Sequence, residues 1–301
     1  MRPSNSGYQM TLFDVPASEI VVNVASVPKR SPFRYPGGKT WLIPHIRQWL
    51  MSIEKRPAIF IEPFAGGSIV GLTVAFEDLA EHVVLVELDK QVAAVWQTII
   101  EGEAEWLAER ILSFDVTLQS VQDVLSLEAM DTREEAFRTI LKNRTYHGGI
   151  LAPGSSLIKN GENGKGLKSR WYPETLAKRI RAIGRIRDRF TFIYGDGISV
   201  MQDYARRKRA AFFIDPPYTA GGANSKRAGK RLYTHHEIDH EMLFSTAERT
   251  AGDVLLTYDD SADVRILAER HSFEIKCVAM KNTHHVKMTE LLISRNLDWL
   301  H

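Results

Sequence analysis

Short apolar runs recur along the chain, and each of them ends abruptly at a polar residue or a turn. Seven of these runs have the length of buried strands: residues 59–61, 83–86, 192–194, 211–214, 254–257, 274–278 and 291–294. Helical stretches separate most of the runs. Strands that alternate with helices are typical of the α/β class, and we expect a seven-stranded, doubly wound sheet.

The strand pattern stops between Trp106 and Arg187, where helical stretches and a glycine-rich loop at residues 161–166 take its place. We therefore expect a mostly helical module at residues 101–187, inserted between two parts of one sheet domain, residues 31–100 and 188–301. Residues 1–30 have weak periodicity and several breakers, so we interpret them as a flexible N-terminal extension.

Composition limits the classes of protein to which the chain can belong. Of its 301 residues 44% are apolar, and no apolar run approaches the roughly 20 residues of a membrane helix. Cys277 is the only cysteine, which excludes internal disulfides and cysteine-based zinc sites. The N-terminus lacks a basic region followed by an apolar core. These features favour a cytoplasmic protein, bacterial or phage-encoded, with no membrane partner.

The net charge is only +2, but the charged residues are unevenly distributed. Residues 101–135 hold ten acids and two bases, whereas residues 159–189 hold ten bases and three acids. A second basic group flanks residues 215–218 and consists of Arg206, Arg207, Lys208, Arg209, Lys226, Arg227, Lys230 and Arg231. Such clusters indicate a polyanionic substrate, although solvated helix faces are the alternative explanation.

The sequence Asp215-Pro216-Pro217-Tyr218 directly follows the apolar run at residues 211–214. It therefore lies at the carboxyl edge of the predicted sheet, where open α/β sheets bind their ligands. The Asp215 carboxylate and the Pro216 carbonyl can accept both protons of an amino group, and Tyr218 can stack on a ring. This arrangement suits a flat, amino-bearing ring such as a nucleobase. Taken alone, an ordinary turn is the alternative.

Two more acids end predicted strands, next to a glycine-rich turn. The turn at residues 63–68, which contains Phe64 and Gly66, lets a ligand approach the backbone closely. Glu87 is placed to bind both hydroxyls of a ribose, and Asp196 is placed to accept a hydrogen bond from an adenine amino group. Together these positions favour an adenosine-containing cofactor.

Gly38-Lys39-Thr40 raises a rival interpretation, because a phosphate-binding P-loop ends in these residue types. Phe33 occupies the position of the first glycine of that motif, and no strand precedes it, so we reject the P-loop. Lys39 remains a cation after a flexible turn. Nor do we expect a metal site among the histidines, which are His235, His236, His240, His284 and His285.

Four blocks of residues, 36–39, 62–68, 143–144 and 215–218, together resemble the Dam-type DNA adenine-N6 methyltransferases. Their order matches the α arrangement of amino-methyltransferases, in which cofactor motifs precede the target-recognition insertion and Asp-Pro-Pro-Tyr comes last. The resemblance runs from about Phe33 to about Arg295. It implies a Rossmann-like methyltransferase sheet as catalytic domain and a target-recognition function for the insertion.

The resemblance also implies S-adenosylmethionine as cofactor. Tyr35, Lys39, Glu87 and Asp215 match the family's cofactor-contacting positions, although Asp is commoner than Glu at position 87. Residues implied or expected to contact DNA are Asn143, Arg144, Lys165, Lys168, Arg170, Lys226, Arg227, Lys230 and Arg231. The sequence after Arg144 departs from the family pattern, so no recognition sequence is assumed.

The function that these residues favour is site-specific methylation of adenine N6 in double-stranded DNA. Asp215 and Pro216 would localise the amine's lone pair, and Tyr218 would stack on a base that has flipped out of the duplex. Methylation of cytosine N4 stays open, because its amino group suits the same motif. A catalytically silent DNA-binding protein of the same fold is a third hypothesis.

Two further partners follow from short signals. Gln9-Met10-Thr11-Leu12-Phe13 is similar to the Gln-x-x-Leu-Phe peptides that dock on bacterial sliding clamps, although a tail segment that packs on its own domain is the favoured alternative. The family resemblance is also compatible with a cognate restriction enzyme.

Overall fold

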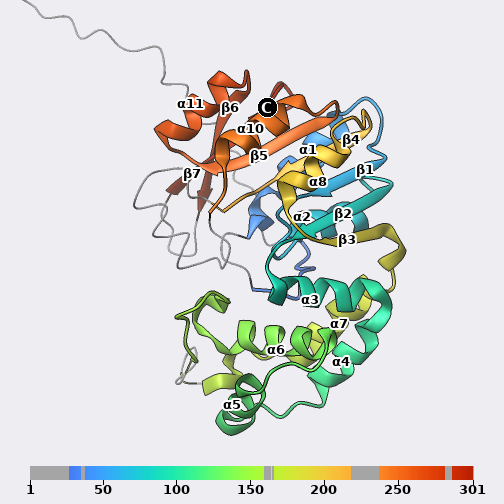
Figure 1. Cartoon of the computed structure of the whole chain (residues 1–301), viewed down its shortest axis with the longest axis vertical. Helices are drawn as coiled ribbons and strands as arrows, with labels where there is room; N and C mark the ends of the chain where they lie inside the picture. The colour runs from blue at the N-terminus through green and yellow to red at the C-terminus, as the bar shows by residue number, and fades with distance from the viewer. Residues whose placement is uncertain are drawn as a thin grey trace, which may run out of the picture.

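The computed structural model describes residues 27–34, 38–158, 164, 166–217, 237–281 and 287–300. Its centre is a seven-stranded sheet with the order β3-β2-β1-β4-β5-β7-β6 (Figure 1). The strands are β1 Ile59–Glu62, β2 His82–Glu87, β3 Phe190–Tyr194, β4 Ala210–Ile214, β5 Asp253–Asp259, β6 Glu274–Lys281 and β7 Lys287–Ser294. All seven predicted strands are confirmed.

The first five strands are parallel, and β7 runs antiparallel to both of its neighbours, β5 and β6. Side chains of the central strands alternate between two cores. Phe60, Leu85 and Phe213 belong to one core, whereas Ile61 and Phe212 belong to the other. Because both faces are apolar, both must be covered by helices, which confirms the doubly wound α/β fold.

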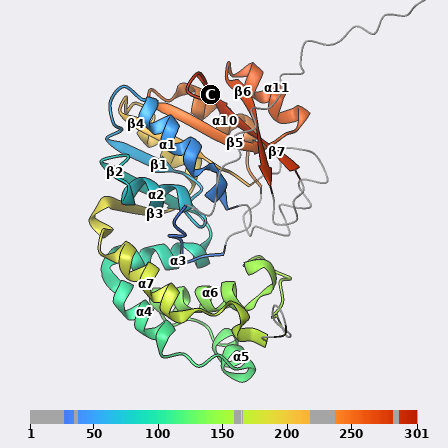
Figure 2. The ribbon, with the colours of Figure 1, turned by 180° about the vertical axis from the view of Figure 1, so that it is seen from behind.

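The helices divide between these two cores. Helices α1 Ile43–Ser52, α2 Ile69–Phe76 and α3 Lys90–Thr98 contribute side chains to the first core, and α8 Gly197–Tyr204, α10 His240–Arg249 and α11 Ala262–Arg270 contribute to the second. In Figure 2, which shows the molecule from behind, α1 lies in front of the sheet. None of the described helices is both long and apolar enough to cross a membrane.

A group of four helices lies at one end of the molecule, below the sheet in Figure 1. It consists of α4 Ala104–Leu112, α5 Leu118–Ser126, α6 Thr132–Thr145 and α7 Pro173–Gly184. Helix α6 packs against α3, and α7 packs against α4. Leu107, Ile140 and Ile180 from this group join the same core as Trp96 of α3. The helices are thus fixed to the sheet by continuous apolar packing. The domain limits given above stay a prediction.

The last residues of the predicted extension pack on the sheet domain. Val27 is buried, and the Arg30 guanidinium forms an ion pair with Glu77 and lies over the Phe76 ring. This contact places the following residues, 31–34, beside the ends of α6 and α7, where they line the candidate site.

Candidate functional site

A cavity of about 950 Å³ lies at the carboxyl ends of β3, β2, β1 and β4. These four strands are neighbours in the sheet, and the chain reverses its direction of travel across the sheet between β1 and β4. Open α/β sheets bind ligands at this reversal. The acids Glu62, Glu87, Asp196 and Asp215 all line the cavity, so the structure brings together strand ends that lie up to 153 positions apart.

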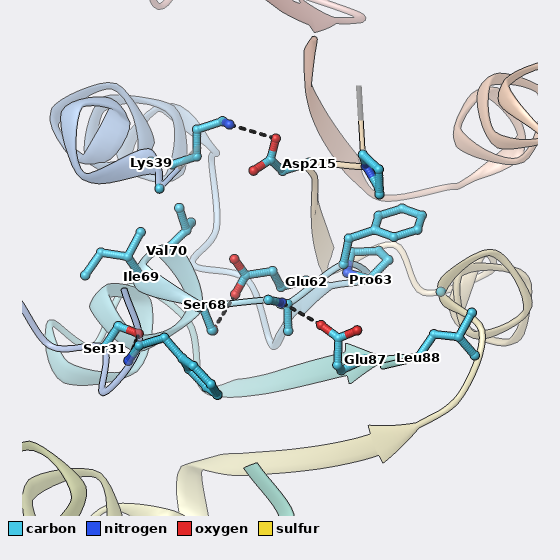
Figure 3. A pocket seen from close by; sticks show the side chains of 18 of the residues that line it. Ser31, Lys39, Glu62, Pro63, Ser68, Ile69, Val70, Glu87, Leu88 and Asp215 are labelled. Atoms are coloured by element: carbon cyan, nitrogen blue, oxygen red, sulfur yellow. Dashed lines mark hydrogen bonds and ion pairs between the residues drawn. The ribbon is translucent and has the colours of Figure 1, made fainter. Parts of the chain in front are cut away.

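Glu87 ends β2 and is held by two backbone amides. Gly66 N donates to its Oε2 at 2.8 Å, and Asp89 N donates to its Oε1 at 2.8 Å. Burial raises the pKa of Glu87 to about 7, and the nearby Asp89 adds to the rise while the amides oppose it. The indole of Trp96 donates to the Gly66 carbonyl at 2.9 Å and fixes the glycine turn above the carboxyl group. Figure 3 shows Glu87 beneath this turn.

Glu62 is a functional candidate that the sequence reasoning missed, because it was considered only as part of the block at residues 62–68 and was given no role of its own. It is buried at the end of β1, and its Oε2 accepts hydrogen bonds from Ser68 Oγ at 2.6 Å and from Gly71 N at 3.0 Å. Burial raises its pKa to about 8. Gly71 is required for this approach, since an added Cβ would lie 2.5 Å from Glu62 Oε2.

Asp215 ends β4 and takes part in a buried charge network. Lys39 Nζ lies 3.0 Å from Asp215 Oδ1 and 3.1 Å from Oε1 of Glu290, a buried residue of β7. Thr257 of β5 donates its hydroxyl to the same Asp215 Oδ1 at 2.8 Å. Lys39 and Asp215 point toward one another across the cavity (Figure 3). Burial alone would lower the pKa of Lys39, but the two carboxylates outweigh it and the net shift is upward.

Glu290 and Thr257 were also missed as site residues. The signal for Glu290 was present, because an acid inside the apolar end of a strand must find a cation or a hydrogen-bond donor. Thr257 gave no such signal, since a threonine in a strand is ordinary.

Asp196 lies where it was expected, at the end of β3 and on the cavity wall. It is also the N-cap of α8, and its Oδ1 accepts from both Ser199 N and Ser199 Oγ at 2.8 Å. Phe64 and Gly66 line the same cavity. Pro217 lines it as well, whereas Pro216 is buried beside Asp215. The roles of these residues stay predictions.

The structure shows that Asn143 is an anchor within the fold, and its expected DNA contact stays a prediction. Its side chain is fully buried at the end of α6, its amide nitrogen donates to the carbonyls of Arg34 and Gly149, and its amide oxygen accepts from Arg34 N at 2.9 Å. It therefore anchors residues 31–34 to the helices. Arg144 is also buried, donates to the Pro32 carbonyl and lines the cavity.

Among the other predicted DNA-contacting residues, Lys168 is exposed and forms a surface ion pair with Asp115, and Arg170 is partly buried nearby. Several predicted site residues lie outside the described part of the chain: Gln9, Phe13, Tyr35, Lys165, Tyr218, Lys226, Arg227, Lys230 and Arg231. Within the described ranges, no group of three or more His, Cys, Asp or Glu side chains is arranged to hold a metal ion.

Comparison with solved structures finds several methyltransferases. A candidate RNA methyltransferase from Pyrococcus horikoshii has a TM-score of 0.42 and 10% identity over 91% of this chain and 96% of its own. The rRNA methyltransferase AviRa from Streptomyces viridochromogenes has a TM-score of 0.39 and 10% identity over 91% and 94%. A candidate class I S-adenosylmethionine-dependent methyltransferase from Listeria monocytogenes has a TM-score of 0.36 and 9% identity over 84% and 59%. No curated protein sequence matches at a significant level.

A family model decides the identity. The model of the D12 class N6 adenine-specific DNA methyltransferases matches residues 35–283, most of the chain. This match includes the glycine turn, Glu87, Asp196 and the Asp-Pro-Pro-Tyr sequence, so the motifs and most of the residues that line the cavity lie in the matched region. The cavity also fits an adenosyl ligand, because its volume is ample and carboxyl oxygens line it at four neighbouring strand ends. The chain belongs to the D12 class N6 adenine-specific DNA methyltransferase family, whose methyl donor is S-adenosylmethionine.

Proposed function

We propose that this chain transfers a methyl group from S-adenosylmethionine to N6 of an adenine that has flipped out of double-stranded DNA. The observation that carries the proposal is the position of Asp215. Its carboxylate lines the cavity at the reversal between β1 and β4, and Lys39 and Thr257 both fix its Oδ1.

In this proposal, Asp215 and the Pro216 carbonyl accept the two protons of the adenine amino group. The amine is a poor nucleophile because its lone pair is delocalised into the ring, and two acceptors oppose that delocalisation. The bound cofactor supplies an electrophilic methyl group. Positive charge develops on the amine during transfer, and two carboxylates sharing the single ammonium of Lys39 leave a net negative charge beside it.

Lys39 and Thr257 also fix the orientation of Asp215. Both contact its Oδ1, so Asp215 acts first as a hydrogen-bond acceptor that orients the amine. The amine's proton becomes strongly acidic only once the methyl group has been transferred, and the carboxylate can then take it. At the other end of the cavity, Glu87 is placed to accept from ribose hydroxyls.

The test is incubation of the protein with methyl-labelled S-adenosylmethionine and mixed-sequence duplex DNA, followed by digestion and nucleoside analysis. We expect label in N6-methyladenine. Label in N4-methylcytosine, label only in an RNA control, or DNA binding without any transfer would each contradict the proposal. Docking on a sliding clamp through residues 9–13 stays a separate prediction, which truncation of the tail would test.

A further inference from the structure

Opposite the row of acids, the cavity has a wall of arginines. Arg34, Arg144 and Arg179 line it, together with Tyr172. They come from three elements: the segment at residues 31–34, the end of α6, and α7. Arg170 lies close enough to Arg34 and Arg144 to affect the pKa of Arg144. We call Arg34, Arg144 and Arg179 the arginine wall.

Backbone contacts hold this wall in place. Arg144 Nη2 donates to the Pro32 carbonyl, and Arg179 Nη1 donates to the Ser31 carbonyl at 3.0 Å. Both acceptors are neutral, so these bonds position the guanidinium groups without neutralising them. Arg144 Nε is buried and has no hydrogen-bond partner among the described residues.

Other cations of the same basic stretch are neutralised by acids. Arg181, two positions after Arg179 on α7, pairs with both Glu105 and Glu109, and Lys168 pairs with Asp115. Within the described residues, no such ion pair involves Arg144 or Arg179. The surface cations of this stretch therefore have acids beside them. Arg144 and Arg179, which are further from solvent, lie beside each other instead.

This arrangement is unfavourable unless an anion binds there. Burial lowers the pKa of Arg144 to about 9, and the neighbouring charges of Arg179, Arg34 and Arg170 lower it further. Burial also lowers the pKa of Arg179. Arg144 and Arg179 are like charges that are partly removed from water and have no ion-pair partner among the described residues, which costs free energy in the ligand-free protein. An oxyanion between these two groups would offset that cost.

We propose that the arginine wall is an anion subsite that binds a phosphodiester of the DNA backbone next to the flipped adenine. A phosphodiester offers two non-bridging oxygens, and guanidinium groups donate to such oxygens in pairs. The assignment rests on the proposed function, since it places the backbone of the target nucleotide beside the cavity.

The cofactor also carries an oxyanion, the carboxylate of its methionine part, but the extent of the basic residues favours DNA. Tyr172 lines the cavity next to the wall and is exposed, and Arg170 lies beside the wall without lining the cavity. The basic residues therefore continue past the space that a small ligand would fill. A phosphate chain, in contrast, extends in this direction.

The experiment measures the affinity for mixed-sequence duplex DNA at a series of salt concentrations, for the wild type and four variants. Each phosphate contact contributes about 0.9 to the slope of log affinity against log salt. We expect Arg179→Gln to weaken DNA binding and to reduce the magnitude of this slope by about 1. Arg179→Lys should restore most of the slope, because it keeps the charge and a donor. Arg34→Gln should reduce the slope too, because it removes another charge that lines the cavity. The segment should stay in place in this variant, since backbone atoms of residue 34 bind Asn143.

The matched control is Lys178→Gln, which removes one charge from the adjacent, exposed position of α7 that does not line the cavity. Its slope should equal that of the wild type. Calorimetry with S-adenosylmethionine should give unchanged cofactor affinity for all variants, and thermal unfolding checks that each is folded.

Three results would overturn the subsite. The first is an unchanged slope in the folded Arg179→Gln and Arg34→Gln variants. The second is an equal reduction of the slope in Lys178→Gln. The third is a lower cofactor affinity with an unchanged slope, which would assign the wall to the cofactor carboxylate. Failure of the proposed function is distinguishable, because the wild type would then bind DNA with the expected slope but form no N6-methyladenine.

Discussion

The two sides of the cavity differ in charge and in how the chain builds them. The acidic side consists of Glu62, Glu87, Asp196 and Asp215, each at or just beyond the end of a parallel strand. The arginine wall is assembled from the segment at residues 31–34 and two helices, through contacts such as Arg179 to Ser31, 148 positions apart. One side has acceptors for hydroxyl and amino protons, and the other has donors for oxyanions.

In the proposed function, this difference separates two tasks, the transfer of the methyl group and the binding of DNA. Acceptors at the sheet edge are rigid, because the strands pair on both sides, and rigidity suits the positioning of a reacting amine. The arginine wall depends on the placement of residues 31–34, so it can be altered without disturbing the sheet. Substitutions on the acidic side should therefore change turnover, and those on the arginine wall should change DNA affinity.

The largest effect is expected for Asp215→Ala. It removes the acceptor of the amine proton, and the rate of methyl transfer should fall by about 10³-fold or more. DNA affinity and its salt dependence should stay close to the wild type, in contrast to Arg179→Gln. Single-turnover transfer of labelled methyl groups measures the first quantity, and DNA titration measures the second.

A matched control is Asp203→Asn, an acid on the exposed face of α8. It should leave the transfer rate unchanged. A fully active Asp215→Ala variant would remove the role assigned to Asp215, and a variant that lost DNA binding instead of turnover would remove the separation between the two sides.

The sequence predicted the acidic side far better than the arginine wall, for a physical reason. A strand-terminal acid can be predicted from a local signal, because it follows an apolar run that stops. Parallel strands then bring such ends to one edge of the sheet. Glu87, Asp196 and Asp215 could therefore be placed on the cavity without knowledge of the strand order.

The arginine wall has no local signal. Arg34 and Arg179 are ordinary basic residues in the sequence, and long-range hydrogen bonds from Asn143, Arg144 and Arg179 hold residues 31–34 against the helices. The pair Asn143-Arg144 was noticed, but a buried anchor and a DNA contact look the same in a sequence. Thr257 likewise gave no local signal. Glu290 gave one, an acid in an apolar strand, but its partner Lys39 is evident only once β7 lies beside β5.

A smaller effect on the acidic side is expected for Thr257→Val, which removes the hydroxyl bond to Asp215 Oδ1 and keeps the shape of the side chain. A hydrogen bond to a charged group contributes about 1.5–3 kcal/mol, so kcat should fall about tenfold to a hundredfold. Because Thr257 acts through Asp215, the Asp215→Ala background should show no further loss. A Thr257→Ser variant should recover most of the activity, and additive losses in the double variant would contradict the positioning role.

The smallest effect concerns the stability cost of placing Glu62 among other acids. Burial, with the charges of Asp215 and Glu87, raises its pKa from 4.5 to about 8. Between these two pKa values the folded protein holds a proton on Glu62 that the unfolded chain has lost. The free energy of unfolding therefore falls as pH rises, by up to about 1.4 kcal/mol per pH unit. Glu62→Gln should remove this contribution and leave the smaller one from Glu87, which ends near pH 7.

Denaturant unfolding at about seven pH values, half a unit apart between pH 5 and pH 8, measures that slope. Glu62→Gln keeps an acceptor for Ser68 Oγ and Gly71 N, so the variant should fold and should gain relative stability toward the alkaline end. Glu128→Gln, a substitution of an exposed acid, should leave the profile of the wild type unchanged. An identical slope in wild type and Glu62→Gln would mean that Glu62 is ionised in the folded protein. The acidic side would then carry one more negative charge against the arginine wall, and its attraction for a cationic sulfonium would be stronger than the present geometry implies.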